Sequence, residues 1–238
     1  MEDVLKINSV SKHFGGFTAL NGVNLNVRGG ERLGLIGPNG SGKTTLINCI
    51  SGALSNEEGD IHFKGELVSK MPAYLRTRRG IARSFQIPRP FRSMAVLENL
   101  LVPLSYVRGI TGKPADQMAE EILTGMGLAS KMNAECSQLS QVELRKLELA
   151  RAMAAKPELL ISDEAMAGLA GTEIDEVLAI LFSLNEQGIT IIMIEHIMQA
   201  VMAFSQRVVC LDAGQIICEG TPHEVVANEY VQRAYLGD

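Results

Sequence analysis

GPNGSGKT at residues 37–44 matches the pattern G-x-x-x-x-G-K-[ST] in full. It follows the apolar run RLGLI at 32–36 and precedes TTLINCI at 44–50, in which apolar residues recur at helical spacing. Glycines let consecutive backbone N–H groups turn toward one anion, and the helix that follows adds its positive end. A chance glycine turn is the alternative, but this context favours a strand, a phosphate-binding loop and a helix that Gly52 ends.

The two residues that end this loop predict a nucleoside triphosphate with magnesium as the ligand. Lys43 would reach the β- and γ-phosphates, and the Thr44 hydroxyl would bind Mg²⁺. ATP and Mg²⁺ are therefore the expected cofactors. The residues of this segment that we expect to contact the nucleotide are Gly37, Pro38, Asn39, Gly40, Ser41, Gly42, Lys43, Thr44 and Thr45.

The composition fits a globular chain and argues against two functional classes. With 238 residues, 46% of them hydrophobic, the chain can bury a sizeable core. A net charge of -5 provides no basic field to attract nucleic acid, so we expect no nucleic-acid partner. The most apolar segment, 189–204, is interrupted by Glu195 and His196, and we expect no membrane-spanning helix. The four cysteines lack metal-binding spacing, and the first ten residues do not resemble a secretory signal.

Hydrophobic patterning predicts an α/β fold of the P-loop NTPase type with a helical insertion. VLKINSV at 4–10 and ALNGVNLNV at 19–27 indicate strands of an N-terminal antiparallel β subdomain. Within 88–155, apolar residues recur at helical spacing with few β-branched positions. We therefore predict a nucleotide-binding core at 1–87 and 156–238, and a helical subdomain at 88–155.

After Pro157 the pattern returns to alternating strands and helices. ELLIS at 158–162 and ITIIMI at 189–194 are predicted core strands, with a helix at 172–187 between them and another from His196. RVVCLD and QIICEG, which follow, are joined by a predicted hairpin turn. This alternation predicts a mostly parallel sheet wrapped by helices, with ligands at the carboxyl ends of the strands.

Polar residues follow two of these predicted strands. Asp163 and Glu164 come directly after ELLIS, and His196 follows ITIIMI. Alone, an acidic pair after an apolar run is more often a solvated strand end, and a single histidine is more often structural. Because a complete phosphate loop is present, we predict that Asp163 binds Mg²⁺ and that Glu164 acts as general base or positions the attacking water.

The order of these motifs resembles the ATP-binding cassette (ABC) ATPases over essentially the whole chain. That order is the phosphate loop, Gln86 after a strand, a helical stretch, LSQVE at 139–143, the acidic pair, and His196. The resemblance implies that Gln86 senses the metal and the water and links to a membrane partner, and that His196 contacts the γ-phosphate. The catalytic residues predicted are Glu164, His196, Gln86 and Lys43, and the metal ligands predicted are Thr44, Gln86 and Asp163.

Two further nucleotide contacts follow from the resemblance. Phe14 resembles the aromatic residue that stacks on adenine, although core packing beside Phe17 is an equal alternative. Ser140 matches the serine of the family's signature motif, through which one subunit contacts the nucleotide held by the opposing subunit.

The signature region departs from the family pattern LSGGQ. Ser140 remains, but Val142 replaces a glycine, which allows close backbone approach, and Glu143 adds negative charge near the site of a triphosphate. Ala165 and Ala170 replace the usual proline and aspartate that follow the catalytic glutamate. A homodimer would carry two altered signatures, whereas pairing with a different ATPase would give one strong and one weak site. We expect slower hydrolysis in the homodimer.

The most similar branch of the family is the ATPases of branched-chain amino-acid importers. RRGIARSFQIPRPFRSMAVLENL at 78–100 and the segment TPHEVVANEYVQRAYLGD at 221–238 carry that resemblance. It implies an ATP-hydrolysing subunit at the cytoplasmic face of the membrane, paired with integral-membrane permease subunits and a second ABC ATPase. An external substrate-binding protein would contact the permease, not this chain.

Two alternative functions remain from the sequence. One is a lipopolysaccharide-export type ABC ATPase, and the other is a soluble ABC-type nucleotide switch with little hydrolysis. Arg89, Phe91 and Arg92 follow Gln86, so an exposed apolar and basic groove there would suit a short helix of a membrane subunit, with a solvated loop as the alternative.

Overall fold

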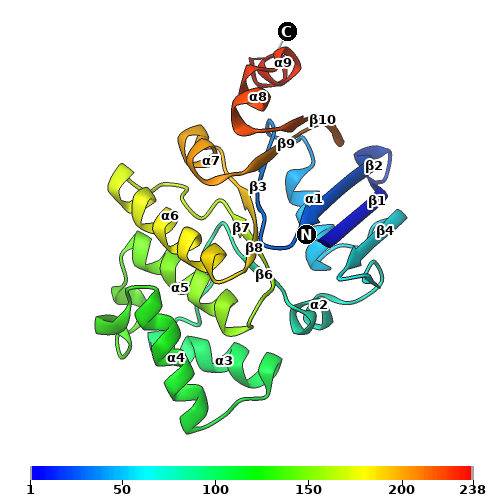
Figure 1. Cartoon of the computed structure of the whole chain (residues 1–238). Coiled ribbons are helices and arrows are strands. Elements are labelled where there is room, and N and C mark those ends of the chain that lie inside the picture. Colours follow the sequence, from blue (N-terminus) through cyan, green and yellow to red (C-terminus); the bar gives the residue numbers. More distant parts are fainter. Residues whose placement is uncertain (1, 237–238) are drawn as a thin grey trace.

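The computed structural model describes residues 2–236, and it contains an antiparallel sheet beside a mostly parallel one (Figure 1). Residue 1 and residues 237–238, at the outer limits of the predicted domains, lie outside the described residues. The antiparallel sheet contains, in spatial order, β2 (Phe17–Arg28), β1 (Asp3–Phe14), β4 (Glu58–Phe63) and β5 (Glu66–Leu67). The alternation of buried and exposed residues along β2 explains why the N-terminal strands could be predicted.

The central sheet contains five parallel strands, whose carboxyl ends lie at one edge. Its spatial order is β10 (Gln215–Gly220), β9 (Arg207–Asp212), β3 (Arg32–Ile36), β8 (Thr190–Ile194), β7 (Leu159–Asp163) and β6 (Ile81–Ser84). All neighbours are parallel except β10, which forms the predicted hairpin with β9. The phosphate loop, the acidic pair, His196 and Gln86 therefore all follow strands that end at the same edge.

Helix α1 (Lys43–Ser51) lies between the two sheets (Figure 1). Its apolar residues Leu46, Ile47 and Ile50 belong to one core with buried residues of both sheets. Gly52 ends the helix in the left-handed conformation, as predicted. The helix that follows the phosphate loop is therefore packed on two sides, and this packing also fixes the position of the end of the loop.

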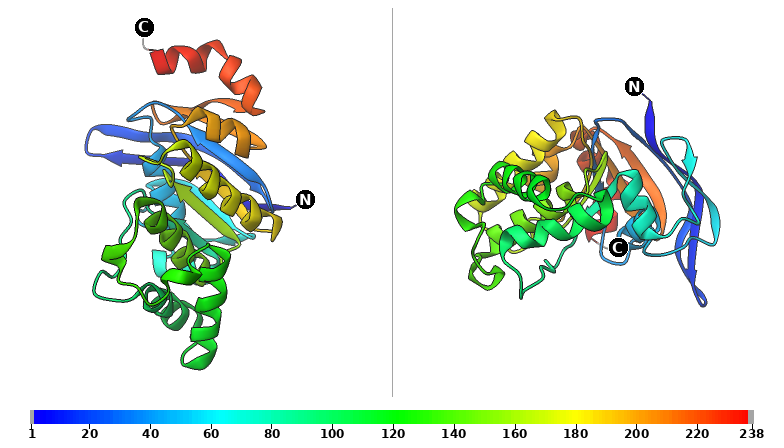
Figure 2. Two further views of the ribbon diagram at one scale, coloured as in Figure 1. Left: turned by 90° about the vertical axis from the view of Figure 1, so that its left-hand side faces the viewer. Right: turned by 90° about the horizontal axis from the view of Figure 1, so that it is seen from below.

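The other face of the central sheet is covered by helices (Figures 1 and 2). Alternate residues of the sheet strands contribute to this second core: Leu160 and Ile191 face it, whereas Ile161 and Ile192 face α1. Strands buried on both faces are expected to be continuously apolar, which is why ELLIS and ITIIMI were recognisable. The covering helices are α5 (Gln141–Ala154), α6 (Gly171–Glu186) and α7 (Met198–Phe204), with α3 (Val96–Arg108) and α4 (Lys113–Gly125) packed beyond α5.

Three features differ from or add to the sequence expectations. Helix α7 begins at Met198 rather than at His196, because Ile197 retains an extended backbone. Strand β4 and helix α2 (Ala73–Arg79) had not been identified, nor had the helices α8 (Pro222–Ala227) and α9 (Glu229–Leu236). Two short 3₁₀ turns, Ala129–Lys131 and Cys136–Gln138, lead into α5. Division of the chain into a core and a helical subdomain at 88–155 stays a prediction.

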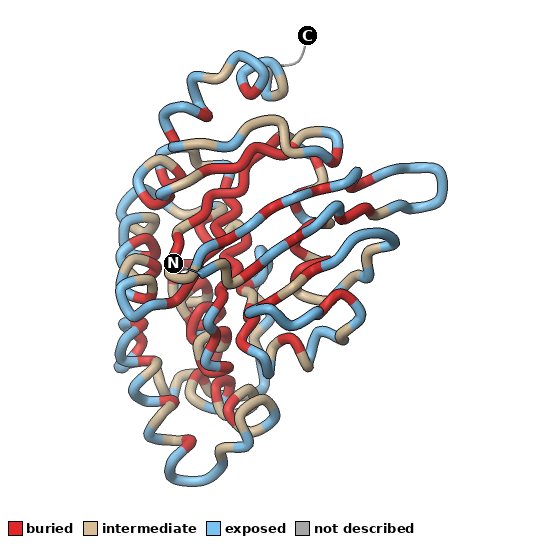
Figure 3. The backbone as a smooth tube through the Cα atoms, turned by 45° about the vertical axis from the view of Figure 1, so that its right-hand side comes forward, coloured by how far each residue is buried: buried red, intermediate tan, exposed pale blue. Residues whose placement is uncertain are grey.

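The tube view in Figure 3 shows buried residues concentrated in the central strands, while the hairpin of β1 and β2 extends outward with an exposed tip. Across residues 2–236, no helix is both long and apolar enough to cross a membrane.

Candidate nucleotide-binding and catalytic site

The phosphate loop occupies the turn between β3 and α1, and two of its glycines are sterically required. Gly37 has φ 147°, and a Cβ there would lie 2.0 Å from the Leu211 carbonyl oxygen. Gly42 has φ 105°, and its Cβ would lie 2.6 Å from the Ala19 carbonyl oxygen. Both φ angles lie in a region of backbone conformation that residues other than glycine disfavour. The glycines of the motif therefore serve close packing against neighbouring strands as well as the turn itself.

Lys43 lies at the start of α1 and is tied to its own loop. Its Nζ donates to the carbonyl oxygens of Gly37 at 2.7 Å and Pro38 at 2.9 Å. Burial lowers the pKa of the ammonium, an effect that the nearby carboxylates of Glu164 and Asp163 oppose. Thr44, one position on, is exposed. This arrangement presents a cation and a hydroxyl side by side at a helix N-terminus, which is the chemistry a bound triphosphate needs.

Glu164 brings three of the predicted residues together. The Gln86 amide donates to its Oε2, and His196 Nε2 lies 2.8 Å from its Oε1. Glu164 has φ 48°, uncommon for a residue other than glycine, and its backbone N–H donates to Ile194 at 2.9 Å. Strain of this kind persists only where the surroundings enforce it and concentrates at functional sites. The carboxylate is thus held from both sides, while its catalytic role stays a prediction.

Asp163 ends β7 and is nearly buried, but its partner had not been identified from the sequence. Arg83 of β6 donates to Asp163 Oδ2 at 2.6 Å and to Asn48 Oδ1, on α1, at 2.6 Å. Strand register explains the contact, because Arg83 pairs with Ile161 on the neighbouring parallel strand. A lone arginine near Gln86 carries no sequence signal for this role.

Glu195 is a second buried acid beside the site. Its Oε1 accepts a hydrogen bond from the Met166 N–H at 2.9 Å, which ties the segment after Glu164 to the end of β8. Burial, aided by the nearby charge of Glu164, raises the pKa of Glu195 to about 7, although backbone N–H groups and Arg145 oppose the shift. Arg145, on α5, donates to the carbonyl oxygens of Gln86 and, at 3.0 Å, of Ala167. The segments carrying Gln86 and Glu164 are therefore joined through α5.

A contact from the far end of the chain also reaches the phosphate loop. The Tyr235 hydroxyl, on α9, accepts a hydrogen bond from the Gly37 N–H at 2.7 Å. The two residues are 198 positions apart, so only the tertiary structure could reveal the contact.

Phe14 and Ser140, predicted nucleotide contacts, occupy different settings. Phe14 pairs with Phe17 at the tip of the β1–β2 hairpin, and the two are 48% and 61% exposed, which argues against core packing. Lys12 Nζ lies 5.2 Å from the centre of the Phe14 ring. The ring is accessible to a base, and stacking stays a prediction.

Ser140 caps the N-terminus of α5 together with Glu143. The Ser140 hydroxyl accepts from the Glu143 N–H at 3.3 Å, and a Glu143 carboxylate oxygen accepts from the Ser140 N–H at 2.8 Å. This is a capping box, in which each side chain satisfies the other residue's backbone donor. The hydrogen bond from Ser140 lowers the pKa of Glu143, so the carboxylate is anionic at neutral pH. The altered signature is therefore well formed as a helix start.

The residues present fit a magnesium nucleotide. Mg²⁺ is usually held by one or two protein oxygens together with substrate phosphates, and Thr44 and Asp163 supply a hydroxyl and a carboxylate. The described part of the chain has no cluster of three or more His, Cys, Asp or Glu that would hold a metal on its own. The Gln86 side-chain N–H donates to Glu164, so the Gln86 side-chain oxygen remains available to bind a metal.

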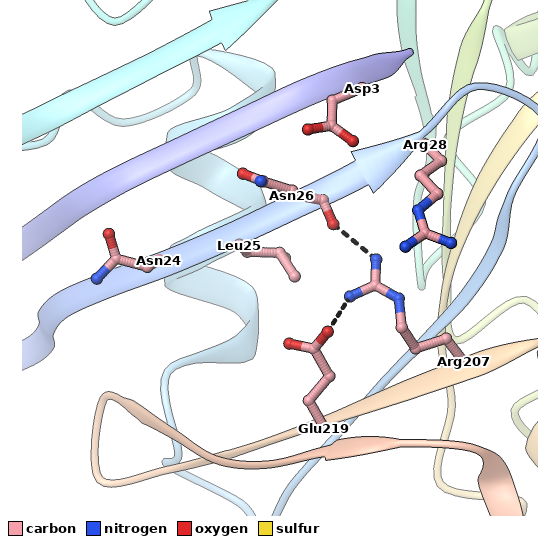
Figure 4. Close-up of a pocket in the computed structure, with 7 residues that line it drawn as sticks. All are labelled: Asp3, Asn24, Leu25, Asn26, Arg28, Arg207 and Glu219. Atoms are coloured by element: carbon pink, nitrogen blue, oxygen red, sulfur yellow. Dashed lines mark hydrogen bonds and ion pairs between the residues drawn. The ribbon is translucent and has the colours of Figure 1, made fainter. Parts of the chain in front are cut away.

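A polar pocket elsewhere is formed by a structural junction. It has a volume of about 410 Å³, and its lining includes Arg28, Arg207 and Glu219 (Figure 4). The Arg207 guanidinium donates hydrogen bonds to Glu219 at 2.6 Å, to the Asn26 carbonyl oxygen at 2.6 Å and to the Glu31 carboxylate. These bonds join the antiparallel sheet to β9 and β10 and argue for a structural role.

Comparison with known proteins identifies the family. The family model described as ABC transporter matches residues 20–167, which is more than half of the chain. The chain belongs to the ABC transporter ATPases. A second family model, described as branched-chain amino acid ATP-binding cassette transporter, matches residues 215–238, the segment that includes Tyr235.

Relatives that match essentially the whole of this chain place this ABC ATPase among transport proteins. It is 34% identical to the high-affinity branched-chain amino acid transport ATP-binding protein BraF of Pseudomonas aeruginosa, over 99% of this chain and 98% of BraF. It is 36% identical to the high-affinity branched-chain amino acid transport ATP-binding protein LivG of Escherichia coli K12, over 100% of this chain and 99% of LivG. The methionine import ATP-binding protein MetN of Rhizobium etli is 37% identical over 99% of this chain and 66% of MetN.

Solved structures agree with the fold. A nucleotide-free ATP-binding cassette from an ABC transporter superposes with a TM-score of 0.92 at 30% identity, with both chains fully covered. An ADP conformation of such a cassette gives a TM-score of 0.89 at 30% identity, again over the whole of both chains. A dimeric bacterial ABC transporter cassette gives 0.83 at 27% identity over 92% of this chain and 98% of the other. The predicted ABC ATPase fold and the family resemblance are confirmed.

Proposed function

We propose that this ABC ATPase is the ATP-hydrolysing subunit of an importer of branched-chain or other amino acids. The observation that carries the proposal is the Glu164 carboxylate, which contacts both Gln86 and His196 at the sheet edge where the phosphate loop begins. The full-length relatives named for branched-chain amino acid transport support the substrate class. They do not favour lipopolysaccharide export or a soluble switch.

The chemistry that we propose is attack of water on the γ-phosphate, in line with the departing ADP. Glu164 would accept the water proton, and the contact with His196 would keep its carboxylate directed at the water. Lys43 would leave the loop carbonyls for the phosphate oxygens and balance their charge. When bound by Thr44 and Asp163, with Gln86 beside them, Mg²⁺ would add charge neutralisation at the phosphates.

An exposed groove beside Gln86 suits a permease helix. It has a volume of about 390 Å³ and lies between α2, α3, α5 and the end of β6 (Figure 1). The lining includes Phe85, Phe91 and Tyr106, all exposed, with Arg151 placed 5.0 Å from the Phe91 ring. Apolar side chains flanked by arginines, including the exposed Arg89 and Arg92 nearby, favour a short amphipathic helix that carries a carboxylate. A subunit that docks on a permease through this groove would lie at the membrane surface, and we propose that this is the cytoplasmic face.

The capping box in the signature motif affects which second ATPase subunit would be the favoured dimer partner. A Glu143 carboxylate oxygen accepts from the Ser140 N–H at 2.8 Å, and Lys131 Nζ lies 3.6 Å from the other oxygen. Because this ion pair is partly exposed and therefore weak, an incoming phosphate would still meet negative charge at the start of α5. We propose that the favoured dimer partner is a different ABC ATPase whose signature lacks this charge, which would complete the phosphate loop of the present chain. A homodimer would hydrolyse ATP slowly at both sites.

Reconstitution with a permease tests the proposed function. The chain would be co-expressed with an amino-acid permease pair and purified from detergent extracts through a tag on the permease. We expect co-purification and ATP-dependent uptake of an amino acid in proteoliposomes, and Tyr106→Asp in the groove should abolish both. Phosphate release without any permease association would contradict the transporter role while leaving the ATPase intact.

A further inference from the structure

The position of Arg83 suggests a control on the metal site. Its guanidinium lies 2.6 Å from Asp163 Oδ2, and the two side chains are only 10% and 8% exposed. A fixed cation on that carboxylate repels a second cation at the same residue, and the repulsion is screened little where water is scarce. Arg83 would therefore oppose the binding of a divalent metal by Asp163.

Arg83 also reaches the surface on which the permease is proposed to dock. Arg83 is one of the residues lining the groove, and its guanidinium carbon lies 5.2 Å from the ring centre of Phe85, another lining residue. Its Nε–H is buried and finds no hydrogen-bond partner within residues 2–236. A buried donor without a partner is costly, so a carboxylate or carbonyl group entering the groove would be drawn to it.

We propose that Arg83 is a positioning residue that lowers the affinity of Asp163 for Mg²⁺ and connects this affinity to occupancy of the groove. The bond from Arg83 to Asn48 extends the link to α1, the helix that carries Lys43 and Thr44. A partner carboxylate that draws the guanidinium toward the groove would release Asp163 for the metal. This inference rests on the proposed function, because it assumes that Asp163 holds the metal of a bound nucleotide.

Mn²⁺ affinities of variants at Arg83 separate the effect of its charge from the effect of its packing. Purified full-length chain would be saturated with β,γ-imido-ATP, and Mn²⁺ binding would be followed by electron paramagnetic resonance. Arg83→Gln removes the charge and should tighten Mn²⁺ binding about tenfold. Arg83→Lys keeps the charge and should stay within about threefold of wild type. Arg79→Gln removes the same charge from an exposed pair with Glu66 and should change nothing.

The direction of the effect makes the test decisive, since simple damage to the fold would weaken metal binding. Unchanged or weaker Mn²⁺ binding in Arg83→Gln, with normal nucleotide affinity in EDTA, would overturn the proposal. If that variant fails to fold, Arg83→Met offers a second neutral side chain with the same expected and contrary results. Failure of the wild-type chain to bind the nucleotide in EDTA would instead contradict the proposed function.

Discussion

Gly37 shows how strongly a single residue constrains the phosphate loop. A Cβ there would lie 2.0 Å from the Leu211 carbonyl oxygen, so Gly37→Ala must move either the loop or β9. We expect a loss of about 3 kcal/mol or more in the free energy of unfolding, with loss of nucleotide binding, measured by urea denaturation and by fluorescent ATP titration.

Gly40→Ala is the matched control for that substitution. Gly40 also has a positive φ of 81°, but within the described structure a Cβ would meet only open space. We expect a cost of about 1 kcal/mol from backbone strain alone. Equal effects of the two substitutions would contradict the packing role assigned to Gly37.

Glu195 predicts a pH dependence of stability. Its pKa in the folded chain is raised from 4.5 to about 7, so the folded state binds the proton more tightly than the unfolded state. The stabilisation is complete below about pH 4.5 and is lost as the pH rises through about 7, a change of at most about 3 kcal/mol. Urea denaturation across this pH window should show the free energy of unfolding falling with rising pH in wild type but not in Glu195→Gln. A slope that persists in the variant would assign the effect to another group.

Helix α9 provides the clearest prediction at the level of elements. Tyr235→Phe removes the hydroxyl that accepts from the Gly37 N–H and leaves that buried donor unpaired. We expect ATP affinity to fall about three- to tenfold, in line with a hydrogen bond worth about 1 kcal/mol. Tyr230→Phe, on the same helix and 70% exposed, is the control. Identical ATP affinities in the two variants would show that α9 does not position the loop.

The elements that could be predicted are those whose signals are local. The phosphate loop, β1 to β3 and the β9–β10 hairpin follow from period-two patterns and glycine turns, and Ala213 and Gly214 both adopt the positive φ that such a hairpin turn needs. The start of α7 was wrong by two residues, because Ile197 stays extended. The bonds of Arg83, Arg145 and Tyr235 were not predictable, since each depends on which strands and helices become neighbours.

At the scale of the whole molecule, the altered signature matters only once two ATPase subunits meet. Val142→Gly with Glu143→Gln restores a glycine and removes the charge, while Gln at the third helical position can still form the capping box with Ser140. We expect the steady-state ATPase rate of the pure protein to rise about tenfold in the double variant. Glu176→Gln, an exposed acid that pairs with Lys146, controls for loss of negative charge. A wild-type protein that alone already hydrolyses ATP at the full rate of a mixture with a partner would contradict the asymmetric dimer.

The central claim is that this ABC ATPase hydrolyses ATP through Glu164, and the most direct test is the turnover of Glu164→Gln. The amide keeps the shape that contacts Gln86 and His196 but accepts no proton, so ATP binding should remain while the hydrolysis rate falls by about 10² to 10⁴. Both quantities can be measured on one preparation, by fluorescent ATP titration and by phosphate release. Near-normal phosphate release from Glu164→Gln would contradict the account.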